Sequence, residues 1–122
     1  MIDYESRLSE ILNDVPGTIL VSLVGTDGMG LANSMKDDSI DIEKMDADIT
    51  SVVINSQKIA KDREKGGLME LFFTTGHSTY IILPINDLYF IYLLVEGEKQ
   101  NLGLARHELH SSLKDFEESL KY

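Results

Sequence analysis

The residues that could support chemistry in this 122-residue chain form incomplete sets, beginning with the histidines. His107 and His110 stand three apart and would share one face of a helix, which is half of a possible metal site. No spacing suggests a third or fourth ligand, and His77 lies in a predicted turn with no evident partner. Solvated surface histidines are therefore favoured, and no metal site is predicted.

The glycine-rich run from Gly25 to Gly30 could be taken for a phosphate-binding loop. It lacks the Gly-Lys-Ser/Thr ending that supplies the phosphate lysine and the magnesium ligand. It also joins a strand to a strand, whereas a phosphate loop opens a helix. The run is interpreted as a hairpin turn, and the chain is not expected to hydrolyse nucleotides itself.

Nucleophilic and acid-base catalysis also lack their usual patterns. The serines include no GxSxG elbow, there is no cysteine, and the carboxylates are spread along predicted helices. The absence of cysteine excludes disulfides and thiolate metal sites and fits a reducing compartment. We expect a protein that is not an enzyme and needs no cofactor.

The charge balance narrows the classes of partner. Eleven Lys and Arg residues against 21 Asp and Glu residues give a formal net charge of -10, which repels nucleic acid and anionic membrane surfaces. The N-terminal segment does not resemble a signal peptide, and the longest apolar run, Leu88 to Val95, is far shorter than the roughly 20 residues of a spanning helix. A cytoplasmic protein with a protein partner is expected, as a single domain over residues 1–122.

The elements that must position any site follow from hydrophobic spacing and from breakers such as Pro16-Gly17 and Gly66-Gly67. The expected order is αββαβββα. It comprises a first helix with apolar positions from Ile2 to Val15, strands at Thr18 to Val24 and Met29 to Met35, a middle helix from about Ile42 to Arg63, strands at Leu68 to Thr75, Ser78 to Ile85 and Leu88 to Val95, and a last helix with an apolar stripe from Leu102 to Leu120.

The first and fifth strands are apolar on both faces, so both faces must be covered. Placing these two strands side by side, with each hairpin neighbour extending outward, predicts a five-stranded antiparallel sheet of order 2-1-5-4-3. Helices are expected on both faces of this α/β (α+β) fold. Strands two and three become its edges.

The predicted third strand is unusually apolar for an edge. Its only charge is Glu70, among Leu68, Met69, Leu71, Phe72 and Phe73. An unguarded apolar edge is an aggregation liability unless it is covered or paired. A helix or a loop could cover it. Edge-to-edge pairing of two copies across a two-fold axis is favoured.

The middle helix has two faces when its residues are placed 100° apart. The stripe expected to face the sheet holds Ile42, Met45, Ile49, Val52, Val53, Ser56, Ile59 and Ala60. On the opposite side, small and apolar groups replace the usual charges: Ala47, Thr50, Ser51 and Ile54, flanked by Lys58 and Lys61. In a two-fold dimer the two middle helices would lie near each other, so this outer face is the predicted partner-binding surface.

A basic cluster ends that helix, with Lys58, Lys61, Arg63 and Lys65. These cations complement the helix dipole, which alone could explain them. The alternative is that they hold an acidic partner. A small-ligand sensor is disfavoured because the sequence indicates no polar cluster in the core.

The sequence resembles the Roadblock/dynein light-chain family. The resemblance rests on Pro16-Gly17 after the first helix, on Ile19-Leu20-Val21-Ser22 leading to Asp27-Gly28, on the run from Asn101 to Arg106, and on the αββαβββα order. It covers nearly the whole chain and implies a Roadblock/profilin-like fold.

The resemblance also implies a function. Members of the family form homodimers or heterodimers through the third strand and middle helix, and they regulate or scaffold small Ras-like GTPases. In bacterial gliding motility, a Roadblock dimer is the GTPase-activating partner of a Ras-like switch protein. The expected function is therefore a homodimer, or a dimer with a paralogue, that binds a Ras-like GTPase and modulates its nucleotide cycle. The alternative is an adaptor subunit of a motor or signalling complex that leaves hydrolysis unchanged.

Overall fold

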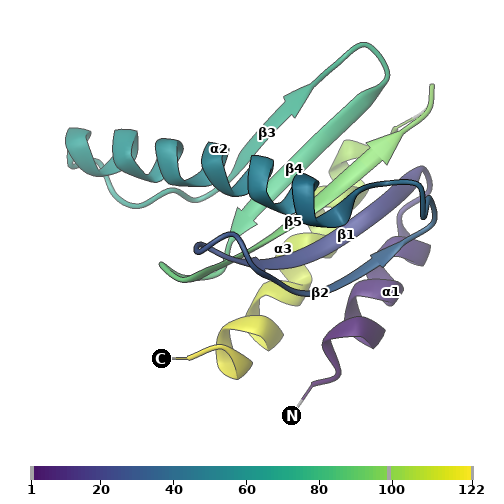
Figure 1. The fold of residues 1–122 in the computed structure, drawn as a ribbon, viewed down its shortest axis with the longest axis horizontal. Coiled ribbons are helices and arrows are strands. Elements are labelled where there is room, and N and C mark those ends of the chain that lie inside the picture. The colour runs from purple at the N-terminus through teal and green to yellow at the C-terminus, as the bar shows by residue number, and fades with distance from the viewer. Residues whose placement is uncertain (1, 99, 122) are drawn as a thin grey trace.

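The computed structural model describes residues 2–98 and 100–121, and its order of elements is the predicted one. Figure 1 shows the strands side by side with helices on both sides of them. The elements are α1 (Tyr4–Asp14), β1 (Thr18–Gly25), β2 (Gly30–Met35), α2 (Ile42–Arg63), β3 (Leu71–Thr74), β4 (Ser78–Pro84), β5 (Tyr89–Glu96) and α3 (Leu102–Ser119).

The strands form one antiparallel sheet of order β2-β1-β5-β4-β3, which confirms the predicted topology. The central pair β1 and β5 is buried almost throughout. Val21 lies opposite Leu93, and Leu93 in turn lies opposite Ile81. The β1–β2 register shifts beside Leu23, since Leu23 pairs with Ala32 and the next residue pairs with Gly30.

Alternation along the strands divides the core into two layers. Val21 and Leu23 pack with α1 and α3, whereas Leu20 and Val24 pack beneath α2. Figure 1 shows α2 crossing one face of the sheet while α1 and α3 lie on the other. The two-faced burial of β1 and β5, which predicted their central place, is thus explained by helices above and below.

The chain between α1 and β1 depends on a glycine. Gly17 has φ 88°, a left-handed conformation, and a Cβ atom at this position would lie 2.7 Å from the carbonyl oxygen of Glu96. The backbone amide of Glu96 donates to the carbonyl of Gly17 at 2.8 Å. Only a residue without a side chain allows this approach, so Gly17 fixes where β1 enters the sheet.

Two elements differ from the sequence prediction by more than one residue at an end. α1 begins at Tyr4, because the Asp3 side chain caps it by accepting from the Ser6 amide, and Ile2 precedes the helix. β3 covers only Leu71–Thr74 rather than Leu68 to Thr75. In the described part of the chain, none of the helices is long and apolar enough to cross a lipid bilayer.

Candidate interaction surface

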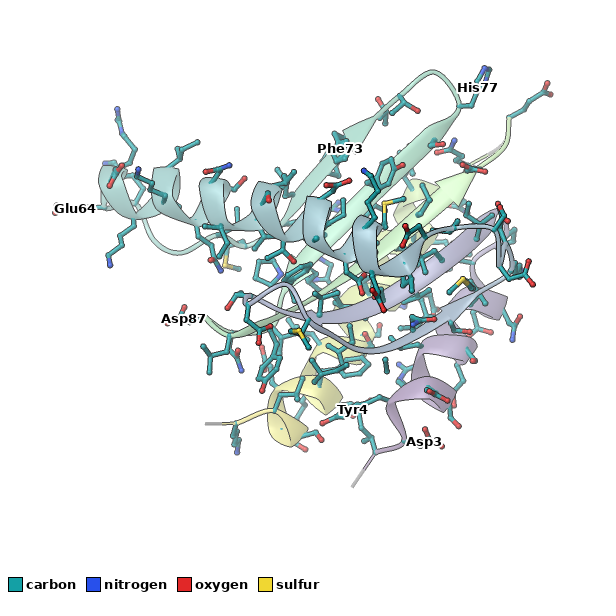
Figure 2. The ribbon with its side chains drawn as sticks, viewed as in Figure 1. Asp3, Tyr4, Glu64, Phe73, His77 and Asp87 are labelled. Atoms are coloured by element: carbon teal, nitrogen blue, oxygen red, sulfur yellow. The ribbon has the colours of Figure 1, made fainter. Side chains whose placement is uncertain are left out.

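The helix α2 is held at both ends by local hydrogen bonds. The Asp41 side chain caps it by accepting from the Lys44 amide at 3.2 Å, and Glu64 ends it in a left-handed conformation. Its predicted bounds are confirmed. Its buried residues, Asp46, Ile49, Thr50 and Val53, lie towards its beginning and middle. The later part extends beyond the sheet, as Figure 1 shows, and ends at the labelled Glu64 in Figure 2.

The outward side of α2 carries a continuous exposed row, which we call the outer stripe: Ala47, Ser51, Ile54, Lys58 and Lys61. Its members alternate at four and three residues, the spacing that keeps side chains on one helix face. Ile54, at 43% exposure, is its large apolar member. The Ser51 hydroxyl is turned to the Ala47 carbonyl at 3.3 Å. The stripe therefore offers a low, lightly polar surface that ends in two ammonium groups.

Thr50 was predicted to lie on this outward side, and the structure corrects that prediction. It is 7% exposed, and its hydroxyl donates to the carbonyl of Asp46 at 2.6 Å. The physical reason is its angle, because three residues along a helix bring Thr50 only about 60° around from the fully buried Val53. Thr50 therefore lies on the buried side of α2 and is not part of the outer stripe.

A second prediction about α2, that Val52 and Ile59 face the sheet, is also corrected. Val52 is only half-buried and outside the core clusters, and Ile59 is 66% exposed. The physical reason is their angle, because Val52 and Ile59 lie about 100–120° around the helix from the buried Val53 and so stand on its flank. Val52 and Ile59 lie about 160° around the helix from Ile54 and Lys61 of the outer stripe, and we call them the β3-side flank.

The edge strand β3 pairs with β4 alone. Phe73 stacks on Tyr80 across the strands with ring centroids 4.6 Å apart, yet 36% of Phe73 remains exposed. Phe72 is 57% exposed, and Met69, just before the strand, is 79% exposed. Figure 2 shows Phe73 on this edge strand. Leu68 and Leu71 are half-buried against the core under α2. The predicted edge thus lies open and apolar in the described chain.

Glu70 is the single charge of this edge, and it is not placed to oppose pairing with another strand. Its carboxylate receives two hydrogen bonds from Arg106 on α3, at 2.5 and 2.7 Å, and lies 3.5 Å from Nε2 of His110. The Arg106 guanidinium holds the pKa of Glu70 below its usual value despite partial burial. His110 is exposed, as expected of a surface histidine, and lies beside this ion pair. Since Glu70 is engaged by α3, the neighbouring apolar side chains are left without a repelling charge.

One functional group was missed by the sequence analysis: a buried carboxylate under α2. Asp46 is 4% exposed, and its Oδ1 accepts from Ser22 Oγ at 2.8 Å and from the Tyr92 hydroxyl at 2.6 Å. The prediction of a core without a polar cluster was therefore wrong. A signal was present, because seven residues along a helix bring Asp46 about 20° around from Val53, on the sheet-facing side.

Burial dominates the electrostatics of this cluster. Desolvation raises the pKa of Asp46 above its usual value, against the opposing effect of the hydrogen bonds from Tyr92 and Ser22. Desolvation, and then the adjacent carboxylate, raise the pKa of Tyr92. Tyr92 is accordingly a hydrogen-bond donor at physiological pH and not a phenolate.

A cavity of about 860 Å³ lies below the later part of α2. Lys58 and Lys61 line it together with the β4–β5 turn and part of α3. In the residues the structure describes, no group of three or more His, Cys, Asp or Glu side chains is placed to hold a metal ion. The two ammonium groups thus serve both the outer stripe and the rim of this cavity.

No protein-family model and no curated protein sequence matches the chain. Solved structures do match. MglB of Myxococcus xanthus superposes with a TM-score of 0.86 at 13% identity, over 94% of this chain and 92% of that one. A Roadblock/LC7 domain from Streptomyces avermitilis gives 0.87 at 14% identity, over 98% of both chains. The chain has the Roadblock fold.

A third solved structure, the gliding protein MglB from Thermus thermophilus, gives a TM-score of 0.82 at 14% identity, over 93% of this chain and 84% of that chain. The likeness to MglB and Roadblock/LC7 proteins confirms the resemblance predicted from sequence, at the level of the fold. At these identities the fold alone carries over, and the roles of particular residues must be argued from this chain's own geometry.

Proposed function

We propose that this protein is a non-enzymatic, dimeric regulator that binds a small Ras-like GTPase in the cytoplasm and modulates its nucleotide cycle. The observation that carries the proposal is the combination of a Roadblock fold close to that of MglB with an open, apolar β3 edge. The fold supports the class of protein. The edge supports the oligomer.

The dimer joins two copies along β3, which extends both sheets into one. The exposed rings of Phe72 and Phe73 and the side chain of Met69 supply apolar area, and the β3-side flank adds Val52 and Ile59. Burying apolar surface stabilises the pair by roughly 25 cal/mol per Å² removed from water, before the entropy cost of association. The partner is a second copy of this chain or a paralogue with a similar edge.

The GTPase binds the outer stripes of the two α2 helices. Ala47 and Ser51 let another backbone approach closely, Ile54 supplies an apolar contact, and Lys58 and Lys61 attract acidic groups. Arg106 is engaged with Glu70, and Arg63 belongs to the last turn of α2, so neither is assigned as a catalytic finger. Activation would come from repositioning the GTPase's own residues.

A second candidate is an adaptor that joins a motor or signalling complex and leaves hydrolysis unchanged. The same outer stripe favours it, because a docking surface needs no effect on the GTPase. The two functions differ only in what happens to the nucleotide once the partner is bound.

Affinity capture with purified protein from native lysate, in parallel with GTPγS and with GDP, tests the proposal. Capture of a Ras-like GTPase, identified by mass spectrometry, that depends on the nucleotide supports a regulator. The captured GTPase is then purified and its single-turnover hydrolysis measured with and without this protein. Capture that is indifferent to nucleotide, with unchanged hydrolysis, supports the adaptor. Recovery of no GTPase in either nucleotide state overturns both.

A further inference from the structure

Only one of the two oxygens of the Asp46 carboxylate is used within the described chain. Oδ1 accepts both hydroxyls, those of Ser22 and Tyr92. No described group donates a hydrogen bond to Oδ2. Oδ2 is not among the buried atoms that lack a partner, so the small exposed part of this 4% exposed side chain includes Oδ2, which is open to the cavity beside it and free to accept a donor from outside the chain.

The free oxygen lies over a glycine in β2. A Cβ atom on Gly30 would be 2.5 Å from Oδ2, closer than a real side chain can approach. Gly30 and Asp46 both line a cavity of about 530 Å³ between the β1–β2 hairpin and the first turns of α2. The absence of a side chain at position 30 is what leaves room for the carboxylate at the cavity wall.

The titratable groups of the cavity lining are all acidic. Glu5 and Glu43 line it together with Asp46, and no Lys, Arg or His does among the described residues. Glu43 is explained by its place in the first turn of α2, where a negative charge complements the helix dipole. Asp46 is not explained in this way, since it lies beyond the first turn and is buried against the sheet. These carboxylates are not among groups placed to hold a metal ion in the described chain.

Two exposed apolar side chains, which we call the apolar rim, lie in the cavity lining beside the exposed Glu5 and Glu43. Met29 is 68% exposed and Leu31 is 41% exposed, and both belong to the lining. An acidic cavity whose lining also exposes two apolar side chains matches a cation that arrives with apolar neighbours. A side chain of a protein segment has that chemistry, whereas a free polyamine or metal ion does not use the rim.

We propose that this cavity, the Asp46 pocket, receives the cationic head of an arginine or lysine side chain from a partner protein, with the partner's adjacent apolar residues packed on Met29 and Leu31. The cation donates to the free Oδ2 while Ser22 and Tyr92 hold Oδ1. A charge-assisted hydrogen bond to a desolvated carboxylate is among the stronger polar contacts in proteins.

The Asp46 pocket is separate from the surfaces of the proposed dimer. It lies beside β2, the edge of the sheet opposite β3, and at the beginning of α2, whereas the overhanging part of the helix is at its end. A dimer built on β3 would therefore present two such pockets, both accessible, and the inference does not depend on the GTPase proposal.

Three capped probes test the pocket by NMR titration of the ¹⁵N-labelled full chain: acetyl-Leu-Arg-Leu-amide, the same peptide with neutral citrulline for arginine, and agmatine acetylated on its primary amine, so that both cationic probes carry one positive charge. The arginine peptide is expected to shift the amides of residues 28–33 and 43–47 saturably, and the citrulline peptide to bind about tenfold more weakly or not at all. Equal binding of the two peptides, or no saturable shift, overturns the proposal.

Agmatine separates a protein segment from a small molecule. It carries the guanidinium without the leucines, so it should bind more weakly than the arginine peptide, and Met29→Ser should reduce only the peptide's affinity. If agmatine binds as tightly as the peptide, or if Met29→Ser changes nothing, the assignment to a protein partner is wrong and the pocket serves a free cation.

Variants of the pocket complete the test. Asp46→Asn keeps an oxygen for Ser22 and Tyr92 but removes the charge, and Gly30→Ala keeps the charge but places a methyl group against Oδ2. Each should abolish the arginine-dependent shifts. Asp48→Asn removes one charge from an exposed carboxylate paired with Lys44 outside the pocket, and binding should be unchanged. The two pocket variants perturb folding differently, so the test remains usable if one of them does not fold. A folded variant of either kind that retains full binding contradicts the proposal.

Discussion

Arg106 of α3 and Glu70, the residue before β3, form a two-pronged ion pair with bonds of 2.5 and 2.7 Å that fastens the open edge of the sheet to a helix. The two residues are far apart in the sequence, and Arg106 is itself half exposed. The pair therefore sets the position of the start of β3 more than it stabilises the fold as a whole. The first prediction concerns its response to acid.

Glu70 should make the chain more stable only above acidic pH. The pKa of Glu70 is lowered in the folded state by Arg106, so its contribution is present above the usual value of 4.5 and is lost as the pH falls through the lower, folded value. Thermal melts of the wild type and Glu70→Gln across this range check it. The difference in Tm should be constant near neutral pH and close in acid, and a gap that widens in acid would contradict the assignment.

The β3 edge should control the oligomeric state. Phe73→Asp puts a charge on the exposed edge beside Tyr80, where it would be buried in an edge-to-edge pair, so the dimer should dissociate to a monomer. Light scattering after size-exclusion chromatography gives the mass. Leu88→Asp is the matched control, because Leu88 has a similar exposure of 43% but lies in the β4–β5 turn. A wild-type monomer would remove the basis of this prediction.

Two isoleucines on α2 should separate partner binding from dimerisation. Ile54→Ser on the outer stripe should weaken GTPase capture about tenfold and leave the dimer intact, since loss of one buried apolar contact costs on the order of 1–2 kcal/mol. Ile59→Ser on the β3-side flank should instead raise the dimer dissociation constant. Both side chains are exposed, at 43% and 66%, so neither change should lower Tm appreciably. If the two variants changed GTPase capture and dimer dissociation in the same way, the assignment of partner binding and dimerisation to different faces of α2 would be refuted.

The buried cluster should respond to substitution in a graded way. Tyr92→Phe removes one donor to Asp46 and should cost about 1–2 kcal/mol in the free energy of unfolding. Asp46→Ala leaves two buried hydroxyls without their acceptor and creates a void, which should cost about 2–4 kcal/mol. Urea denaturation at neutral pH measures both. Equal costs would mean that the second hydroxyl contributes nothing.

The pH dependence of the same cluster should have the opposite sign to that of Glu70. Burial raises the pKa of Asp46 in the folded state above the usual 3.8, so the folded protein holds this proton more tightly than the unfolded chain does. Relative to Asp46→Asn, the wild type should gain stability as the pH falls through the raised value, and the gain should stop below 3.8. Urea midpoints of both proteins through this range are the measurement, and parallel curves would count against a raised pKa.

The parts of the fold that the sequence predicted correctly are those governed by local signals. The bounds of α2 follow from Asp41 at its start and from the glycines after it, and the place of β1 and β5 follows from their two-sided apolar pattern. These signals require no knowledge of neighbouring elements. They also placed Ile54 on the outward side correctly.

The errors arose where the outcome depended on how far one element extends over another. The predicted sheet-facing stripe of α2 included Val52 and Ile59, about 100–120° around the helix from Val53, but the sheet covers a narrower arc centred on Val53. Asp46 was treated as solvated because acidic residues usually are, and its hydroxyl partners, Ser22 and Tyr92, are distant in sequence. Periodicity gives the angle of a residue around its helix but not the extent of the surface beneath it.

The overhang of α2 has a consequence for how assembly could be controlled. After Val53 no residue of the helix is fully buried, although Ser56, Gln57 and Ala60 are half-buried, and a helical segment of about ten residues with few tertiary contacts is marginal in water. Its last turns are therefore expected to become more stably helical when another chain packs against them. Association and the helix–coil equilibrium of residues 54–63 would then be one thermodynamic event, and any factor that shifts that equilibrium sets how tightly two copies hold together.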